Sequence, residues 1–385
     1  MTDATILDFP VAPRLAHPSA QKVSDPSANV PMTTERTGMD AATQHRPSVL
    51  SFSQMDSYDS CPAKWRYQYR DRMPKMETSG AALGGSSVHY VVERMEADYE
   101  RLIAREDSAD DLHDLFVEDF RARIEREVSE AAPLAWGGKK TKSFPDGNNQ
   151  HWWESPVEGG TKMLRKYAAI RRADEQDGTS VIEFPCGACN KTGLVDDAEC
   201  ERCHGVGSKR GIEAKIRTDI EVPCMACGQS GKDTRDRRRK CRACHGDGVV
   251  LHPIVGYVDS MVAVKSIPGR GLVRIVRDVK SGASVLFLKP LQLVVYRKLI
   301  KLAYGWDVGI GQFLWLRGKD ATSQIREYDL EPYDEGFVEA LYRDHLKGID
   351  AGIFPPKPSG LCKSCGYRAY CEWGKHIKEE DLTDE

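Results

Sequence analysis

Eight cysteines between residues 186 and 244 constrain the folding of this chain more than any other feature of its sequence. They form four C-x2-C pairs: Cys186/Cys189, Cys200/Cys203, Cys224/Cys227 and Cys241/Cys244. Two thiolates three positions apart can bind one metal ion through a tight turn, and two such pairs complete a tetrahedral zinc site. Redox-active C-x-x-C pairs would need a thioredoxin-like context, which the sequence lacks. The four pairs therefore predict two zinc ions.

The cysteine pairs belong to an internal repeat. VIEFPCGACNKTG…CERCHGVG recurs as DIEVPCMACGQSG…CRACHGDG, with an offset of 38 residues between Cys186 and Cys224. Strand-like sequence precedes, separates and follows the two copies. This pattern predicts a zinc-binding β-hairpin module, residues 181–252, inserted into the strands of an existing sheet.

The module resembles the cysteine-rich domain of DnaJ-type chaperones, whose unit is C-x-x-C-x-G-x-G. CERCHGVG and CRACHGDG match that unit fully, whereas CGACNKTG and CMACGQSG keep only its last glycine. The resemblance implies that the first pair shares a zinc ion with the fourth, and the second with the third. The internal duplication instead suggests that neighbouring pairs share one, so both pairings stay open. The resemblance covers about 65 residues, and without a His-Pro-Asp tripeptide it gives no support to a co-chaperone function.

Composition and charge exclude some classes of protein. No apolar run approaches the roughly 20 residues that span a bilayer, which argues against an integral membrane protein. The start, MTDATILDFPVAPRL, lacks the basic flank and long apolar stretch of a secretory signal. We therefore expect a cytoplasmic protein whose cysteines bind metals. The net charge of -3 means that any basic surface for nucleic acid must be local.

Four cysteines lie outside the module: Cys61, Cys362, Cys365 and Cys371. We call this set the cysteine clasp, because it would join the first helical region to the C-terminal region. Four thiolates can hold an iron–sulfur cluster, and a third zinc ion is the alternative.

The sequence predicts five segments along the chain. Residues 1–47 are rich in Pro, Ser and Thr and predict a disordered arm, or a short docking peptide around Ile6, Leu7 and Phe9. Val88, Val91, Val92 and Met95 have helical spacing in the first half of the folded chain. The segments in order are the arm (1–47), a helical part (48–180), the zinc module (181–252), a core with strands, a helix and the C-terminal cysteines (253–373), and an acidic tail (374–385).

Within the core segment we expect a strand at IVGYVDSMVAV, a strand at GLVRIVRDVKS and then a helix that begins at Pro290 and ends at Gly305. A helix is also expected near 161–175.

Several side chains could form one polar site. Asp278 and Lys280 are two positions apart on a predicted strand and therefore point to one face, with Asp259 expected on the neighbouring strand. Carboxylate oxygens suit a hard divalent cation, and a lysine can stabilise a developing oxyanion. His89 with Glu93, and Gln292 with Tyr296, are each four apart on a helix. Each pair is weak evidence alone, since D-x-K on a strand is more often a surface charge pair.

Taken in order, these segments resemble the RecB-like branch of the PD-(D/E)XK nucleases. They are LSFSQMDSYDSCPAKWRYQY, GGSSVHYVVE, GYVDSM, RDVKSG, LQLVVY and CKSCGYRAYC. The nearest resemblance is to CRISPR-associated and AddB-type exonucleases that carry an iron–sulfur cluster, and it runs from about residue 49 to 373 once the zinc module is removed. It implies an α/β, restriction-endonuclease-like fold, with a mixed central sheet flanked by helices. It also implies that the cysteine clasp holds a [4Fe–4S] cluster.

The resemblance also implies a role for each residue of the site. His89, Asp259, Asp278 and the carbonyl of Val279 would bind Mg2+ or Mn2+, and Lys280 would assist the attacking water. Gln292 and Tyr296 would orient Lys280 or contact the DNA. The chain departs from the family pattern in its D-V-K motif, where Glu is the more usual first residue.

These expectations point to a metal-dependent DNA exonuclease of recombination, repair or phage DNA processing, acting on single strands or duplex ends. The alternatives are a structure-specific endonuclease and a DNA-binding or adaptor subunit. The chain has no Walker-type ATP motif, so a partner helicase or recombination protein would be separate. Within the module, Arg237, Arg238, Arg239 and Lys240 are candidates for DNA binding. The sequence leaves the cleavage polarity, the strand preference and the oligomeric state open.

Overall fold

A computed structural model of the chain describes residues 47–75, 78–129, 134–135, 159–181, 183–185, 194–195, 198–199, 208–210, 214–282, 288–317, 324–333 and 335–376. The predicted arm (1–47) and acidic tail (374–385) lie almost entirely outside these residues. Among the described helices, none combines the length and apolar character needed to cross a membrane.

A five-stranded mixed sheet forms the centre of the described chain. Its strand order is β14-β13-β12-β11-β4. β12 runs parallel to β13, while the other neighbouring pairs are antiparallel. The strands are β4 (Ser180–Val181), β11 (Ser260–Ile267), β12 (Gly271–Lys280), β13 (Ile310–Trp315) and β14 (Ile325–Asp329).

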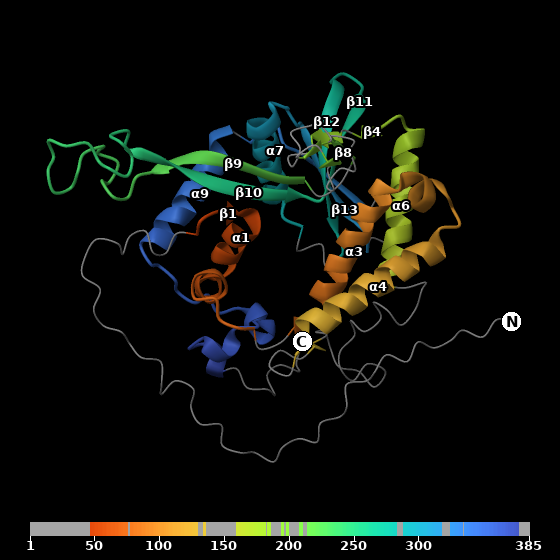
Figure 1. Cartoon of the computed structure of the whole chain (residues 1–385), viewed down its shortest axis with the longest axis horizontal. Helices are drawn as coiled ribbons and strands as arrows, with labels where there is room; N and C mark the ends of the chain where they lie inside the picture. The colour runs from red at the N-terminus through yellow and green to blue at the C-terminus, as the bar shows by residue number, and fades with distance from the viewer. Residues whose placement is uncertain are drawn as a thin grey trace, which may run out of the picture. The chain divides into compact units, whose positions relative to one another are not determined.

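Helices cover both faces of this sheet (Figure 1). On one face lie α1 (Phe52–Ser60), α7 (Pro290–Tyr304) and α9 (Glu335–Asp350), whose apolar side chains meet Val276 and Phe313. On the other face lie α3 (Gly80–Ala97), α4 (Ala109–Glu127) and α6 (Gly160–Gln176), packed on Val279 and Leu314. The two clusters alternate along β12 because successive side chains of a strand point to opposite faces. This architecture is the mixed α/β fold that the sequence predicted.

Several of the predicted helices are confirmed. Val88, Val91, Val92 and Met95 are all buried on α3, as their spacing indicated. α7 begins at Pro290, which needs no hydrogen-bond partner for an N–H in the first turn. It ends at Gly305, whose φ of 69° is left-handed and suits glycine.

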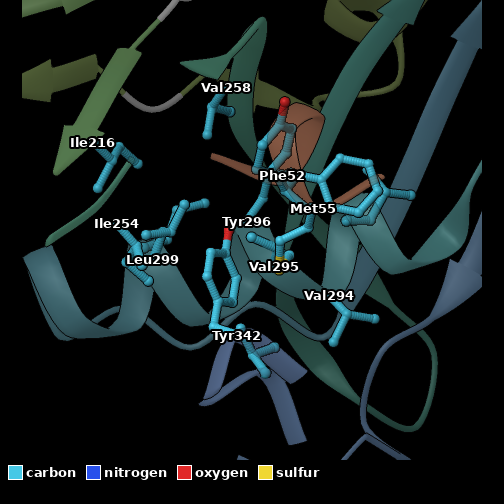
Figure 2. Packing of buried hydrophobic residues seen from close by; sticks show 14 of the residues in the cluster. Phe52, Met55, Ile216, Ile254, Val258, Val294, Val295, Tyr296, Leu299 and Tyr342 are labelled. Atoms are coloured by element: carbon cyan, nitrogen blue, oxygen red, sulfur yellow. The ribbon is translucent and has the colours of Figure 1, made fainter. Parts of the chain in front are cut away.

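A second sheet has three strands in the order β1-β10-β9. β1 (Leu50–Ser51) pairs in parallel with β10 (Val249–Val258), and β10 pairs along its whole length with β9 (Ala214–Pro223). One end of this antiparallel ribbon packs on α7, where Ile216, Ile254 and Val258 meet Leu299 and side chains of α1 (Figure 2). The other end leads to residues 224–248, the second copy of the cysteine repeat (Figure 1).

One strand prediction is wrong. IVGYVDSMVAV was expected to be a single strand, but it is divided at Asp259 between β10 and β11, which belong to different sheets. The β11–β12 register shifts between Ser260 and Val262, at the start of β11. Strand-favouring residues stand on both sides of the break, so strand propensity alone did not reveal it. Asp259 therefore lies at the junction before β11 rather than within it.

Buried charges attach α3 and α6 to the sheet. Arg277 of β12 donates from Nη2 to Asp174 of α6 at 2.8 Å, and Asp174 also accepts from Arg171 at 3.2 Å. Arg171 and Tyr167 each donate to Glu96 of α3 at 2.7 Å. The side chains of Arg171 and Glu96 are fully buried, so their charges must compensate each other.

The remaining elements are short. They are α2 (Pro62–Trp65), two π-helical turns (Arg66–Arg70 and Glu100–Ala104), β2 (Thr78–Ser79) with β3 (Leu134–Ala135), β5 (Glu183–Pro185) with β8 (Ser208–Arg210), β6 (Leu194–Val195) with β7 (Ala198–Glu199), and three 3-10 turns (Gly360–Ser364, Arg368–Tyr370 and Gly374–His376). β5 and β8 are antiparallel and flank the first copy of the cysteine repeat.

Candidate active site

The candidate site is a cleft of about 460 Å³ between α1, α3, α4, α7 and the strands β10 and β12. His89, Glu93, Asp259, Lys280, Gln292 and Tyr296 all line it. The first and last of these residues are almost 210 positions apart in the sequence. We predicted from the sequence that they form one polar site, and the structure brings them together.

Asp278 and Lys280 lie on the face of β12 that meets α7. Lys280 Nζ is 2.7 Å from Asp278 Oδ2, and the carboxylate is fully buried. Burial lowers the pKa of Lys280, but the carboxylates of Asp278 and Asp259 raise it by more, so that it lies above its ordinary value. Lys280 is therefore an ammonium ion, which can donate hydrogen bonds and stabilise negative charge but cannot accept a proton.

Gln292 and Tyr296 on α7 hold Asp278 in place. Gln292 Nε2 donates to Asp278 Oδ1 at 3.0 Å and to the Tyr296 hydroxyl at 2.7 Å, and that hydroxyl donates to Asp278 Oδ1 at 3.4 Å. Burial and the nearby carboxylates raise the pKa of Tyr296, which keeps the phenol protonated. The resemblance implied that both residues would orient Lys280 or contact the DNA; in the described part of the chain their hydrogen bonds go to each other and to Asp278, the partner of Lys280.

α7 approaches β10 closely because position 256 is a glycine. A Cβ atom built on Gly256 would lie 2.3 Å from Leu299 Cδ1 and 3.4 Å from the Tyr296 ring. The glycine of the GYVDSM segment therefore leaves room for Leu299 of α7 against β10.

His89 and Asp259 form the opposite part of the cleft. His89 lies on α3, one turn before Glu93, and its Nδ1 atom is 3.4 Å from Asp259 Oδ2. Burial of most of the ring lowers the pKa of His89 to about 4; the Asp278 carboxylate opposes this shift and the Lys280 ammonium adds to it. The imidazole is therefore neutral at pH 7 and offers a nitrogen lone pair.

Sequence reasoning missed several residues that line the cleft. They are Ser51, Ser53, Ser86, Tyr90, Tyr257 and Arg123. Arg123 lies on α4 and pairs with Asp119, one turn earlier, at 2.5 Å. Its i,i+4 spacing from an aspartate looked like any surface pair on a helix, so no local signal marked it.

The second copy of the cysteine repeat forms a compact thiol cluster. Cys224, Cys227, Cys241 and Cys244 are buried, and their sulfur atoms all lie within 4.8 Å of one another. The Sγ atoms of Cys224 and Cys241 are 3.8 Å apart, and those of Cys227 and Cys244 are 3.7 Å apart. Two thiolates at about 2.3 Å from a tetrahedral zinc ion lie about 3.8 Å apart. The cluster therefore fits a metal ion of this kind, and it joins neighbouring pairs, as the internal duplication suggested.

The glycines of the C-x-x-C-x-G-x-G unit have a steric reason in this cluster. Gly246 and Gly248 have φ values of 105° and 75°, and a Cβ atom on Gly248 would lie 2.5 Å from the Gln229 carbonyl oxygen. The N–H of Gly248 points to Cys244 Sγ at 3.3 Å. These glycines let the backbone fold around the thiols.

The other predicted cysteine sites are less fully described. Cys186, Cys189, Cys200 and Cys203 lie outside the described residues. Among the described residues, the cysteine clasp does not form a group as compact as the second copy. Cys362 and Cys61 both lie against Lys357, since Cys362 Sγ is 4.0 Å from the Lys357 carbonyl oxygen and Cys61 Sγ faces the Lys357 N–H. Burial raises the pKa of the Cys365 thiol.

The C-terminal segment packs on the first helices, as the clasp requires. The N–H of Lys357 points to Cys61 Sγ at 3.5 Å, and the Tyr67 hydroxyl donates to the Tyr370 carbonyl at 3.0 Å. The ring of Trp65 stacks on that of Phe354, with centroids 5.6 Å apart.

Comparison with known proteins places these features in a family. The family model described as "PD-(D/E)XK nuclease superfamily" matches residues 49–187 and 226–372. Its interruption falls inside the segment that we predicted to be an insertion.

Two further similarities are partial or weak. The chain is 35% identical over 71 residues to the chaperone protein DnaJ of Chlorobium chlorochromatii (strain CaD3), a match that covers 18% of each protein. The crystal structure of SSO0001 aligns over 78% of this chain and 88% of its own, with 11% identity and a TM-score of 0.27, which is too low to support an argument. The assignment therefore depends on the family model, which spans most of the chain and both halves of the cleft, and by it the chain belongs to the PD-(D/E)XK nuclease superfamily.

Proposed function

We propose that this nuclease is a metal-dependent DNA exonuclease that hydrolyses phosphodiester bonds in single strands or at duplex ends, in recombination, repair or phage DNA processing. The observation that carries the proposal is the convergence of His89, Asp259 and Lys280 on one cleft, with the buried Asp278 paired with Lys280 behind it, in a chain of this superfamily.

The donor atoms of the cleft fit a divalent cation. Nucleases of this superfamily use such ions, and Mg2+ and Mn2+ favour carboxylate and carbonyl oxygens. His89 Nδ1 and Asp259 Oδ2 lie 3.4 Å apart, and the buried Asp278 faces the same side. We propose these three residues as ligands, with the carbonyl of Val279 as a fourth. A bound cation would supply positive charge to the reacting phosphate and activate the attacking water.

The side chains around the cation site have separate tasks. The Lys280 ammonium donates hydrogen bonds to a phosphate oxygen or to the attacking water, where negative charge develops. Asp278 fixes the position of that ammonium at 2.7 Å. Gln292 and Tyr296 fix Asp278 in turn, so that the carboxylate does not have to reorganise when DNA binds. They also line the cleft and could contact the strand.

The cysteine clasp completes the proposal as a [4Fe–4S] site. A [4Fe–4S] cluster needs four thiolate ligands, and the clasp offers four free cysteines where the C-terminal segment packs on the first helices: Cys61, Cys362, Cys365 and Cys371. N–H groups of Lys357 and Ser359 point to the sulfurs of Cys61 and Cys362 at 3.5 and 3.4 Å. Two zinc ions would occupy the two copies of the repeat.

The test uses protein purified without oxygen, supplied with Mg2+ or Mn2+. The substrates are end-labelled single-stranded DNA, end-labelled duplex DNA and covalently closed circles of each. An exonuclease degrades the linear molecules and leaves the circles intact. Cleavage of circles would instead identify an endonuclease. DNA binding without any cleavage would identify an adaptor subunit. Asp278→Asn serves as the inactive control.

A further inference from the structure

The strongest unexplained feature lies at the far end of the β9–β10 ribbon. Residues 224–248, which we call the ribbon tip, contain seven basic side chains against three acidic ones, a net charge of +4. The corresponding part of the first copy, residues 186–207, has a net charge of -2. The seven basic residues of the tip are all exposed: Lys232, Arg235, Arg237, Arg238, Arg239, Lys240 and Arg242. Zinc binding alone does not require this charge, since the two copies share their cysteine pattern.

Two of the three acids in the tip shape its backbone. Asp233 Oδ1 accepts hydrogen bonds from the N–H groups of Arg235 and Asp236 at 2.8 and 3.1 Å. Asp236 accepts from the N–H of Arg238 at 3.1 Å and pairs with Arg239 at 3.3 Å. Arg237 and Arg238 form no ion pair with any described residue. The carboxylates of Asp233 and Asp236 are therefore engaged within the tip, and the guanidinium groups of its arginines stay exposed to solvent.

The tip is held at a fixed distance from the cleft. The ribbon is paired without a break from Val249 with Pro223 to Val258 with Ala214. Val255, Gly256 and Tyr257 of the same ribbon line the cleft. Eight residues separate Val249 from Tyr257, which is about 27 Å at about 3.4 Å per residue. A metal ion in the four-thiol cluster would fix the tip at the end of this span.

The composition of the tip distinguishes between two forms of DNA. Proteins that bind single strands stack the bases on aromatic side chains. Residues 224–248 contain no Phe, Tyr or Trp. Exposed arginines without aromatic partners suit the phosphates of a duplex, whose backbone carries closely spaced charge whatever the sequence.

We propose that the ribbon tip binds the phosphate backbone of duplex DNA at least about eight base pairs away from the DNA end in the cleft. This minimum spacing follows from the 27 Å span of the ribbon, beyond which the basic residues of the tip lie, and a rise of about 3.4 Å per base pair. The position of the DNA end rests on the proposed nuclease function. The tip and the cleft then bind one duplex at two separate places, and duplexes too short to reach both lose the contribution of the tip.

The test compares two variants with equal loss of charge. The tip variant is Arg237→Gln/Arg238→Gln/Arg239→Gln/Lys240→Gln. The control variant is Arg101→Gln/Arg105→Gln/Arg126→Gln/Lys347→Gln, which removes four exposed side chains that form surface ion pairs. Binding of fluorescein-labelled duplexes of 6 and 20 base pairs is measured by anisotropy, without divalent metal and over a range of salt concentrations. Zinc content and circular dichroism show whether the tip is folded.

We expect the tip variant to bind the 20-base-pair duplex at least about tenfold more weakly than wild type, with a salt slope less negative by up to about 3.6, since each lost phosphate contact changes the slope by about 0.9. Its affinity for the 6-base-pair duplex should equal that of the control variant. The proposal is overturned if a tip variant with full zinc content binds the long duplex with wild-type affinity and wild-type salt slope. In that case the tip would bind a protein partner instead. An equal loss of affinity for the 6- and 20-base-pair duplexes would overturn the proposed distance between the tip contact and the DNA end. Because these assays involve no cleavage, a protein that shows the predicted binding but cuts no DNA refutes the nuclease proposal alone.

Discussion

Replacing Lys280 by methionine removes the ammonium group and keeps most of the length of the side chain. In the structure this ammonium lies 2.7 Å from a carboxylate with no exposed surface, and a quarter of the lysine side chain is exposed in the cleft. The substitution therefore has two consequences, one for the reaction and one for the buried Asp278.

The magnitude of each consequence follows from this geometry. At 2.7 Å and an effective dielectric constant of about 20, the gross attraction of the pair is about 6 kcal/mol. Leaving one member of a buried pair without its partner costs about 3–5 kcal/mol of stability. A divalent cation should recover part of that loss, since it gives Asp278 a new positive neighbour. Loss of a preorganised donor to the reacting group should lower kcat by about 10²–10³-fold.

The assay separates chemistry from binding. We expect Lys280→Met to lower single-turnover cleavage of end-labelled DNA by that factor, while the Kd for DNA changes by less than about tenfold because one phosphate contact is lost. Lys347→Met is the control, since Lys347 forms an exposed ion pair with Asp344 on α9. A wild-type kcat in folded Lys280→Met protein would refute the assigned role. If DNA affinity fell strongly at the same time, Lys280 would be a residue that binds DNA and takes no part in the reaction.

Three further predictions concern other parts of the molecule. Asp259→Asn should lose tight Mn2+ binding in calorimetry and lose cleavage, and an unchanged Mn2+ affinity would remove Asp259 from the ligand set. Cys371→Ser should bleach the brown colour of anaerobic protein and lower its Tm, because cluster binding stabilises the fold; colourless wild-type protein without iron would contradict this. Arg171→Met should reduce the free energy of unfolding by about 3–5 kcal/mol because it leaves the buried carboxylate of Glu96 without its positive partner. Adding Glu96→Gln should recover part of that loss in urea unfolding, and an unchanged midpoint in the single variant would show that the pair is dispensable.

Local sequence patterns predicted the parts of the fold that depend on neighbouring residues. Pro290 and Gly305 marked the ends of α7, because the backbone preferences of these residues act within a single turn. The two-residue spacing of Asp278 and Lys280 placed both on one face of β12, because a strand alternates its side chains. The repeat of C-x2-C pairs predicted metal sites and left two pairings open, and the four thiols of the second copy come together as neighbouring pairs.

The tertiary structure decided what depends on contacts between distant segments. No local pattern showed that IVGYVDSMVAV divides between two sheets, which places Asp259 at the junction beside His89 of α3. Nor did the sequence show that Gln292 and Tyr296 hold Asp278, or that Arg123 reaches the cleft. The sequence alone determined the chemical groups and their local geometry, because period and turn preference are properties of a few adjacent residues. Their convergence on one cleft required the packing of α3, α4 and α7 around the two sheets. The hydrophobic effect is not directional, so burial of apolar surface does not by itself choose which elements become neighbours. Only the complete core specifies which polar side chains meet at its edge.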